Sequence, residues 1–331
     1  MKKKIIAIII AIIIIGVIII TTIKLTDKEE KNNNLTTIRL AEVTHSVFYA
    51  PMYVAIENGY FESEGIEIDL ILTSGADKVS AAVLSDTVDI GFAGTESSIY
   101  IYAGSEEDYL VTFAGLTKRD GQFILARDCS EDFELSDLYG KEILVGRSGG
   151  MPAVNFLNAM KNAGMDVNKI NVNYSIDFAN LSGSFIGGIG DYVNLFEPTA
   201  TTVVNVSNAC IVDSIGRLSG EVPYTAFYAR KSYLENNEEL LIGFTRAIAK
   251  GLDYVLTHES SEVADVILPQ FPDSAKNDII TIIDNYKEYD SWLSTPYITE
   301  SSFNNLQDML IDNDLLEDYG PYSDLIHNLY E

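Results

Sequence analysis

A helix-to-strand transition between residues 49 and 73 constrains the fold more than any other part of the sequence. An apolar segment with helical spacing ends at Asn58-Gly59, a pair that suits the left-handed residue with which many helices close. After a charged turn, apolar residues recur at every second position from Ile66 to Leu72, which is the period of a β-strand. This segment therefore predicts a helix followed directly by a strand.

Helices and strands continue to alternate along the chain, and a short buried strand at 88–92 opens into a turn at Gly94. The other predicted strands are 37–43, 66–72, 110–116, 122–127, 141–145, 170–176, 191–196, 209–212 and 224–229. The predicted helices are 51–58, 77–84, 97–102, 152–163, 239–257, 260–268, 274–292, 301–310 and 322–329. Such alternation indicates βαβ units, an α/β fold and mainly parallel sheets.

The pattern A-P-x-Y-x-A-x-E-x-G-Y-F-x-x-x-G-I-x-I at residues 50–68, followed by Val88-Asp89-Ile90-Gly91, is specific rather than generic. It resembles the solute-binding proteins of ABC importers in the nitrate/sulfonate/bicarbonate group, which includes binders of the thiamine pyrimidine precursor. The resemblance covers the chain from residue 36 onward. It implies the type II periplasmic-binding-protein fold, in which two βα lobes are joined by a hinge of two crossings. Lobe 1 is then formed by 36–122 and 223–331, and lobe 2 by 123–222.

The N-terminus is expected to be a separate unit. Three lysines, Lys2 to Lys4, precede an apolar run from Ile5 to Ile20, which Thr21-Thr22-Ile23 extends. A helix of this length spans about 28 Å, close to the thickness of a bilayer, and the lysines place the remainder of the chain outside. We predict an uncleaved signal anchor at 1–23 and a tether at 24–35. A cleaved signal is the alternative, but no small-x-small cleavage site follows the run.

The chain is strongly acidic, with 49 acidic against 22 basic residues and a formal net charge of −27. Such a surface repels nucleic acid and anionic lipid headgroups, so we predict no nucleic-acid partner. The charge indicates solubility outside the cell rather than an acidic docking face. Together with the anchor, it predicts an extracytoplasmic, membrane-anchored monomer.

Cys129 and Cys210 are the two cysteines of the chain. A disulfide between them is conceivable, but pairing cannot be deduced from sequence, and two buried small residues are the favoured interpretation. Neither cysteine lies in a CxxC or His-rich context, so we predict no metal and no cofactor.

The strand-to-helix loops are the predicted ligand site, because open parallel sheets bind ligands beyond the carboxyl ends of their strands. The first lobe contributes His45, Ser46, Phe48, Tyr49, Ser74, Gly75, Thr95 and Glu96. The second contributes Ser148, Gly149, Gly150, Asp177, Phe178 and Glu197, and Tyr224 stands at the return crossing. In the proteins that this chain resembles, the turn equivalent to 148–150 donates backbone N–H groups to the solute. The competing interpretation is structural: these residues cap helices, form turns or pack beneath them, and Glu197 bonds beside the hinge.

The charges of these loops bear on the solute. Glu96, Asp177 and Glu197 are acidic, and Arg147 is the only base predicted within a loop at the mouth. A sulfonate or nitrate needs N–H groups or cations with few carboxylates nearby. Carboxylates and aromatic rings instead suit a flat ring bearing amino groups. We therefore expect an amino-substituted heterocycle such as a thiamine pyrimidine precursor, with sulfonate or taurine, nitrate or bicarbonate as the alternative.

Binding is predicted in preference to catalysis. Enzymes related to the group make the thiamine pyrimidine, and the resemblance implies that they need a cysteine-rich motif and an active-site histidine and lysine. This chain has separated cysteines and three histidines, of which His258 and His327 fall in C-terminal helices. It contains no HExxH, P-loop or GxGxxG motif. We expect a solute-binding protein that closes on a small molecule and docks on permease subunits. A synthase-like enzyme or the receptor domain of a sensor is the alternative.

Overall fold

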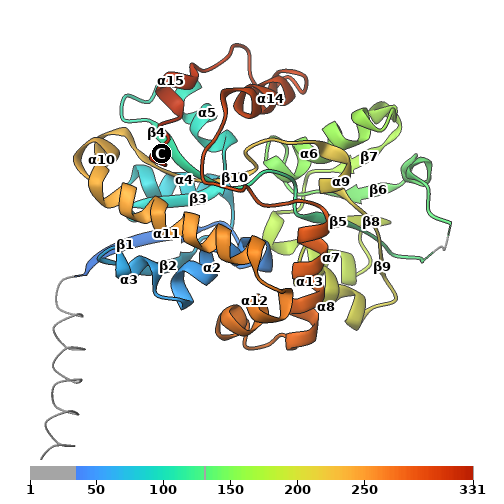
Figure 1. The fold of residues 1–331 in the computed structure, drawn as a ribbon. Helices are drawn as coiled ribbons and strands as arrows, with labels where there is room; N and C mark the ends of the chain where they lie inside the picture. The colour runs from blue at the N-terminus through green and yellow to red at the C-terminus, as the bar shows by residue number, and fades with distance from the viewer. Residues whose placement is uncertain (1–34, 130–131, 331) are drawn as a thin grey trace, which may run out of the picture.

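The computed structural model describes residues 35–129 and 132–330, and in it two five-stranded sheets form separate lobes (Figure 1). The first sheet has the order β2-β1-β3-β10-β4. Its strands are β1 (Thr36–Glu42), β2 (Ile66–Leu72), β3 (Ile90–Gly94), β4 (Leu110–Thr117) and β10 (Thr225–Arg230). β1 runs parallel to β2 and β3, whereas β10 runs antiparallel to β3 and β4.

The second sheet repeats this plan with the order β7-β6-β8-β5-β9. Its strands are β5 (Gln122–Ala126), β6 (Glu142–Leu144), β7 (Asn171–Asn173), β8 (Tyr192–Phe196) and β9 (Cys210–Ser214). Here β5, which arrives from the first lobe, runs antiparallel to β8 and β9. The predicted α/β fold with two lobes is confirmed. The sheets are more mixed than predicted, because each contains a strand that enters from the other lobe, and strand direction leaves no mark in the residue pattern.

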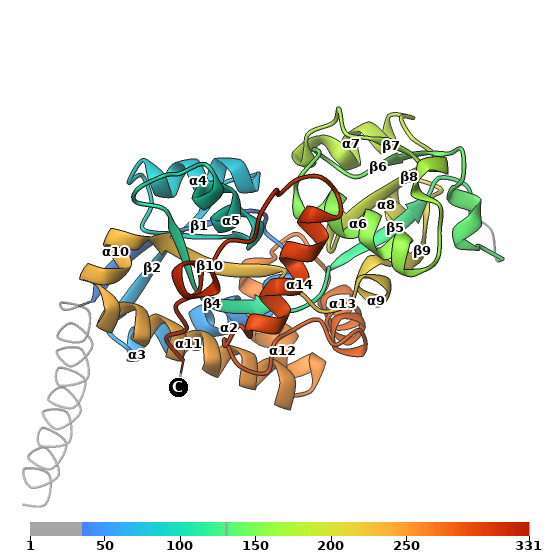
Figure 2. The same ribbon diagram turned by 90° about the horizontal axis from the view of Figure 1, so that it is seen from above.

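Helices cover both faces of each sheet (Figure 2). On the first sheet, α2 (Ala50–Glu57), α3 (Tyr60–Ser63) and α11 (Glu238–Thr257) lie on one face, and α4 (Ala76–Leu84) and α5 (Glu96–Ala103) on the other. On the second, α6 (Met151–Asn162) and α9 (Ile215–Ser219) lie opposite α7 (Leu181–Ile186) and α8 (Thr199–Val206). The remaining elements are α10 (Lys231–Asn236), α12 (Ser260–Ile267), α13 (Lys276–Glu288), α14 (Glu300–Ile311), α15 (Tyr322–Leu325), and the short helices at Val47–Tyr49, Leu135–Leu138, Val167–Lys169, Phe178–Asn180 and Leu268–Gln270.

Local signals explain why these elements begin and end where they do. Gly59 has φ +69°, the left-handed conformation expected of the Asn-Gly closure of α2. Two predicted C-terminal helices end early because the chain leaves them to bond β4. Residue 327 donates its backbone N–H to the Thr112 carbonyl at 2.9 Å, and Trp292 forms a bridge with Thr117. Helices α3 and α7 to α10 were not predicted as helices, because they are short and lack a long apolar period.

Phe48 packs where the two crossings between the lobes meet, at residues 118–121 and 220–224. Its side chain is 0% exposed, and its ring centre lies 5.6 Å from that of Phe196, 6.0 Å from Tyr224 and 5.0 Å from Tyr286. The indole N–H of Trp292 donates to the Phe48 carbonyl at 2.8 Å. We call these five residues the hinge cluster. Because its members come from both lobes and from the C-terminal helices, it fixes how the crossings sit against each other.

Gly121 is the position at which this packing leaves no room. A Cβ atom there would lie 2.6 Å from the nearest ring carbons of Phe48. We expect Gly121→Ala to lower the free energy of unfolding by about 1–3 kcal/mol, the usual cost of overpacking. Thermal or denaturant unfolding measures this. Gly183→Ala is the matched control, since no atom lies within 4 Å of its Cβ, and equal effects of the two substitutions would contradict the packing argument.

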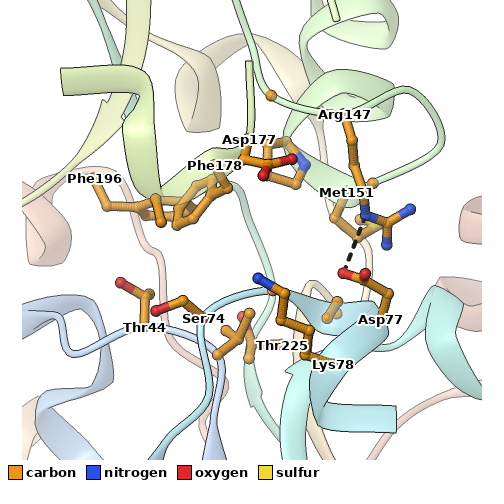
Figure 3. A pocket seen from close by; sticks show the side chains of 18 of the residues that line it. Thr44, Ser74, Asp77, Lys78, Arg147, Met151, Asp177, Phe178, Phe196 and Thr225 are labelled. Atoms are coloured by element: carbon orange, nitrogen blue, oxygen red, sulfur yellow. Dashed lines mark ion pairs between the residues drawn. The ribbon is translucent and has the colours of Figure 1, made fainter. Parts of the chain in front are cut away.

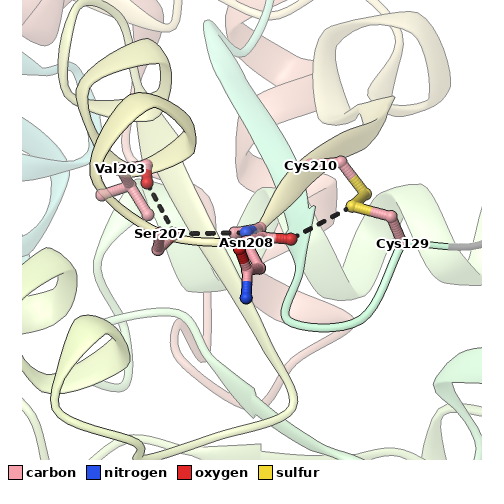
Figure 4. The surroundings of a disulfide bond; sticks show 6 residues. Cys129, Val203, Ser207, Asn208 and Cys210 are labelled. Carbon is pink, nitrogen blue, oxygen red and sulfur yellow. Dashed lines mark hydrogen bonds between the residues drawn. A yellow bond between two sulfur atoms is a disulfide. The ribbon is translucent and has the colours of Figure 1, made fainter.

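Cys129 and Cys210 form a disulfide, with their Cα atoms 5.7 Å apart (Figure 4). The interpretation as two buried small residues is therefore wrong. Cys129 follows β5 and Cys210 begins β9, and these strands are neighbours with Ala126 opposite Cys210. Ser207 shapes the turn before β9, donating to the Val203 carbonyl at 2.6 Å and accepting from the Ala209 N–H at 3.2 Å. The pairing arises from a long-range strand contact that the sequence does not reveal.

This bridge should stabilise the second lobe. It joins positions 81 residues apart, so breaking it releases a long loop in the unfolded chain. We expect the double substitution Cys129→Ser, Cys210→Ser to lower the free energy of unfolding by about 2–4 kcal/mol. Denaturant unfolding with and without reductant tests this. Reductant should destabilise the native sequence and leave the double variant unchanged, and an unfolding midpoint indifferent to reductant would argue against the bridge.

The predicted anchor at 1–23 lies outside the described residues, as does nearly all of the predicted tether at 24–35. Within residues 35–129 and 132–330, no helix combines the length and apolar character needed to cross a bilayer.

Candidate functional site

A cavity of about 200 Å³ lies between the lobes, at the carboxyl ends of the parallel strands (Figure 3). The first lobe lines it with the loops that follow β1, β2 and β3, and with the start of β10. The second lobe lines it with the loop after β6, the start of α6 and the segment before α7. This is the position at which an open α/β sheet binds ligands.

The structure brings eight of the fifteen predicted site residues to this cavity: Tyr49, Ser74, Gly75, Glu96, Gly150, Asp177, Phe178 and Tyr224. The other seven do not line it: His45, Ser46, Phe48, Thr95, Ser148, Gly149 and Glu197. Ligand contact by any of them remains a prediction, since lining a cavity is not the same as binding.

Several side chains that line the cavity were not among the predicted site residues: Thr44, Asp77, Lys78, Met151, Asn180, Phe196 and Thr225. Arg147 was noted for its charge but not included in the predicted site, and it also lines the cavity. Lys78 is a second base there, which corrects the prediction of a single base at the mouth. It was overlooked because it is the second residue of a predicted helix, where a charged side chain usually faces solvent. The free N-terminus of α4 beside it was the signal that could have found it.

An aromatic roof and a polar floor enclose the cavity (Figure 3). Phe178 and Phe196, both from the second lobe, have ring centres 5.8 Å apart and meet edge to face. Thr44, Ser74 and Thr225 lie opposite them on the first lobe. A flat molecule between the two surfaces would pack its face on the rings and present its edge to the hydroxyl groups.

Glu96 supplies a buried carboxyl group to the cavity. It stands at the start of α5 and is 1% exposed. Its Oε1 accepts the Met151 N–H at 3.4 Å, and its Oε2 has no hydrogen-bond partner among the residues that the structure describes. Burial raises the pKa of Glu96 to about 7, although the positive charge of Arg147 works in the opposite direction. A buried oxygen without a hydrogen-bond partner lowers the stability of the fold, unless a ligand donates to it or it binds a proton.

Three contacts hold the lobes against each other around the cavity. Arg147 Nε lies 3.5 Å from Asp77 Oδ1, and the Tyr100 hydroxyl donates to the Gly149 carbonyl at 2.9 Å. Met151 reaches across to Glu96, as described above. The first and third contacts involve side chains that line the cavity, so closure of the lobes and occupation of the cavity depend on the same residues.

Glu197 lies outside the cavity, and its carboxylate is already used. Its Oε2 accepts the Thr201 N–H at 2.9 Å and its Oε1 accepts the Thr201 hydroxyl at 3.0 Å, both at the start of α8. Its backbone carbonyl accepts a hydrogen bond from the Ser46 hydroxyl of the other lobe. In this structure Glu197 therefore caps a helix beside the hinge.

His45 belongs to a buried network next to the cavity. Its Nδ1 lies 2.7 Å from Glu42 Oε1 and its Nε2 lies 2.9 Å from the Gln270 carbonyl, so a doubly protonated ring satisfies both partners. The Tyr53 hydroxyl donates to the other Glu42 oxygen at 2.7 Å. Partial burial lowers the pKa of His45, but the hydrogen bond and charge of Glu42 outweigh it, and the pKa is raised above 6.5. The network ties the loop after β1 to the C-terminal helices.

This raised pKa gives stability a defined dependence on pH. The contribution of His45 should be complete below pH 6.5, where the ring is also protonated in the unfolded chain, and should fade as pH rises through the folded-state pKa. The difference in melting temperature between the native protein and His45→Asn should therefore be constant below pH 6.5 and shrink above it. Thermal melts across pH 5–9 measure this difference. Glu42→Gln should remove its dependence on pH. A difference that grows with pH would show that the ring is bound neutral.

Within residues 35–129 and 132–330, no three His, Cys, Asp or Glu side chains converge in an arrangement that could hold a metal ion.

Comparison with known proteins assigns the family. The family model described as "NMT1/THI5 like" matches residues 47–261. The chain belongs to this family. The resemblance drawn from residues 50–68 and 88–91 is thereby confirmed.

Among curated relatives, YtlA of Bacillus subtilis, whose name marks it provisionally as a binding protein, is 39% identical over 90% of each chain. A 4-amino-5-hydroxymethyl-2-methylpyrimidine phosphate synthase of Aspergillus parasiticus is 25% identical over 66% of each chain. The formylaminopyrimidine-binding protein of Halalkalibacterium halodurans is 25% identical over 66% of this chain and 65% of that one. Among solved structures, the alkanesulfonate-binding protein SsuA of Xanthomonas axonopodis superposes with a TM-score of 0.69 at 15% identity, covering 88% of this chain and 98% of that one. The likeness to SsuA concerns the fold alone.

Proposed function

We propose that this protein is the extracytoplasmic solute-binding component of an ABC importer. Two lobes that enclose a cavity, and relatives named as binding proteins, support this assignment. The sheet orders, with one antiparallel crossing strand in each lobe, support the type II version of the fold. The predicted anchor at 1–23 belongs to the proposal, because it would hold the protein near its permease and raise its effective concentration there.

The proposed solute is an amino-substituted heterocycle, of the class to which the thiamine pyrimidine precursors belong. The observation that carries this is the free Oε2 of Glu96 in a cavity roofed by Phe178 and Phe196. A carboxylate accepts an N–H at the edge of the ring while the aromatic side chains cover its face. The relative named for binding formylaminopyrimidine is consistent with this class.

Capture would proceed by closure of the lobes. An open form admits the solute, and the closed form is favoured because only then do Glu96 from one lobe and the aromatic roof from the other act on it together. The closed protein would then dock on a pair of permease subunits, which receive the solute.

Two alternatives are weaker. A sulfonate, nitrate or bicarbonate ligand is favoured by the cations Lys78 and Arg147, but it would leave Oε2 of the buried Glu96 without a donor. A synthase activity is favoured by the relationship to the pyrimidine phosphate synthases. Against it, Cys129 and Cys210 are joined to each other, and neither they nor His45 line the cavity.

The pH dependence of binding distinguishes the two ligand classes. An amino-heterocycle donates to the ionised form of Glu96, so its affinity should fall as pH is lowered through about 7. An acceptor-only anion would gain affinity over the same range, since protonated Glu96 can donate. Titration of full-length protein with aminopyrimidines, taurine, alkanesulfonates, nitrate and bicarbonate measures this. If none of these ligands raises the melting temperature, the proposed solute is wrong.

Single substitutions then locate the carboxylate responsible. Glu96→Gln should weaken an aminopyrimidine by about 10- to 100-fold, the loss of a charged hydrogen bond, and should flatten the pH profile. Asp120→Asn is a necessary control, because burial at the hinge also raises the pKa of Asp120 to about 7. Glu197→Gln tests the other predicted carboxylate. Loss of affinity in Glu197→Gln with none in Glu96→Gln would transfer the role to Glu197.

A further inference from the structure

Lys78 carries an uncompensated positive charge into the cavity. Its side chain lies in the first turn of α4, and its ammonium group points into the space below Asp177 and Phe178 (Figure 3). It makes no ion pair or hydrogen bond with any residue that the structure describes. The neighbouring Asp77 does not compensate it, because the Asp77 carboxylate faces Arg147 at 3.5 Å.

An unpaired cation is unusual in this protein. Acidic residues outnumber basic ones by 49 to 22, and nearly every described lysine and arginine contacts a carboxylate, a carbonyl or an aromatic ring. Among the described residues the exceptions are Lys78 and Lys141. Lys141 is exposed at the start of β6 and does not line the cavity. Among the described cations Lys78, although also exposed, is therefore the one that combines the lack of a partner with a place in the cavity.

The surroundings of Lys78 suit an oxyanion. Ser74 and Gly75 also line the cavity, and Gly75, with φ +122°, is the N-cap residue of α4, whose first turn contains Asp77 as well as Lys78. A helix N-terminus favours negative charge, and a lysine and a hydroxyl next to it add donors directed at the same space. Arg147 reaches this corner from the second lobe, where its Nε lies 3.5 Å from Asp77 Oδ1.

Glu96 lies at the other end of the cavity floor. Lys78 follows β2 and Glu96 follows β3, and β1 lies between these strands in the sheet. Two strand spacings separate the loops by about 10 Å, a distance that a substituted ring can span while both side chains reach toward it. The cavity thus offers an acceptor at one end of its floor and a cation at the other.

We propose that the solute is bipolar: one molecule carries an N–H donor that Glu96 accepts and an anionic group, a carboxylate, sulfonate or phosphate, that Lys78 binds. This rests on the proposed function and narrows it, since a neutral pyrimidine would leave Lys78 unpaired. It also explains why a cavity with acidic side chains retains a free lysine.

Matched probes test the proposal. Binding of 4-aminopyrimidine-5-carboxylate and of its neutral carboxamide is measured by calorimetry with the full-length protein. The native protein should prefer the carboxylate by about 10-fold or more, as expected of a charged hydrogen bond. Lys78→Met should abolish that preference by weakening the carboxylate alone, and Lys78→Arg should retain it. Lys141→Met, which removes the other unpaired cation, should change neither affinity.

The outcomes separate this inference from the proposed function. Equal binding of the two probes, unaffected by Lys78→Met, would overturn the bipolar ligand and leave an aminopyrimidine binder. If no aminopyrimidine binds but taurine binds in a Lys78-dependent way, the bipolar ligand stands and the heterocycle is wrong. If neither the carboxylate nor taurine binds, or if their binding is indifferent to Lys78, the inference fails.

Discussion

The packing of the Phe48 ring is the constraint on which the arrangement of the two lobes depends. Phe48 comes from the first lobe, Phe196 from the second, Tyr224 from the return crossing, and Tyr286 and Trp292 from the C-terminal part of the chain. Each of these segments would be free to shift if the ring were small. Because protein interiors are close-packed, the cluster instead couples them. Phe196 and Tyr224 also line the cavity, so the packing that sets the hinge sets the shape of the site.

Glu96 differs in its hydrogen bonding from two other carboxylates that are buried nearby. Glu197 is buried beside the hinge and Glu42 is buried next to the cavity. Each of these carboxylates has a protein donor for both oxygens, from Thr201 in the first case and from Tyr53 and His45 in the second. Glu96 is buried as deeply, but keeps one oxygen unbonded within the described structure. Burying an unpaired carboxylate destabilises a fold. Because the unpaired Glu96 oxygen lies inside a cavity, a ligand that bonds it explains its presence better than a contribution to stability does.

The sequence predicted the scaffold well and the site only in part. Strands, their flanking loops and the two-lobe plan follow from local periodicity and turn residues, as the alternation from Ile66 and the Asn-Gly closure of α2 show. What local pattern cannot supply is which side of a loop faces the cavity. Phe48 and Tyr49 are adjacent, yet Tyr49 lines the cavity while Phe48 enters the hinge cluster. The disulfide and the hydrogen bond between Ser46 and the Glu197 carbonyl could not be predicted for a related reason, because both join segments that lie far apart in the chain.

Electrostatics gives the cavity its selectivity. A surface with a large excess of acidic residues repels anions at long range, which disfavours small, purely anionic solutes before they reach the site. Inside the cavity the balance is local: Arg147 is paired with Asp77, and within the described structure Lys78 has no ion pair and Glu96 Oε2 has no hydrogen bond. Within a closed, partly desolvated space these two charges act more strongly than they would on the surface. A molecule without an N–H donor leaves the buried Glu96 oxygen unpaired at a cost, whereas one without an anionic group forgoes the attraction of Lys78, which is exposed.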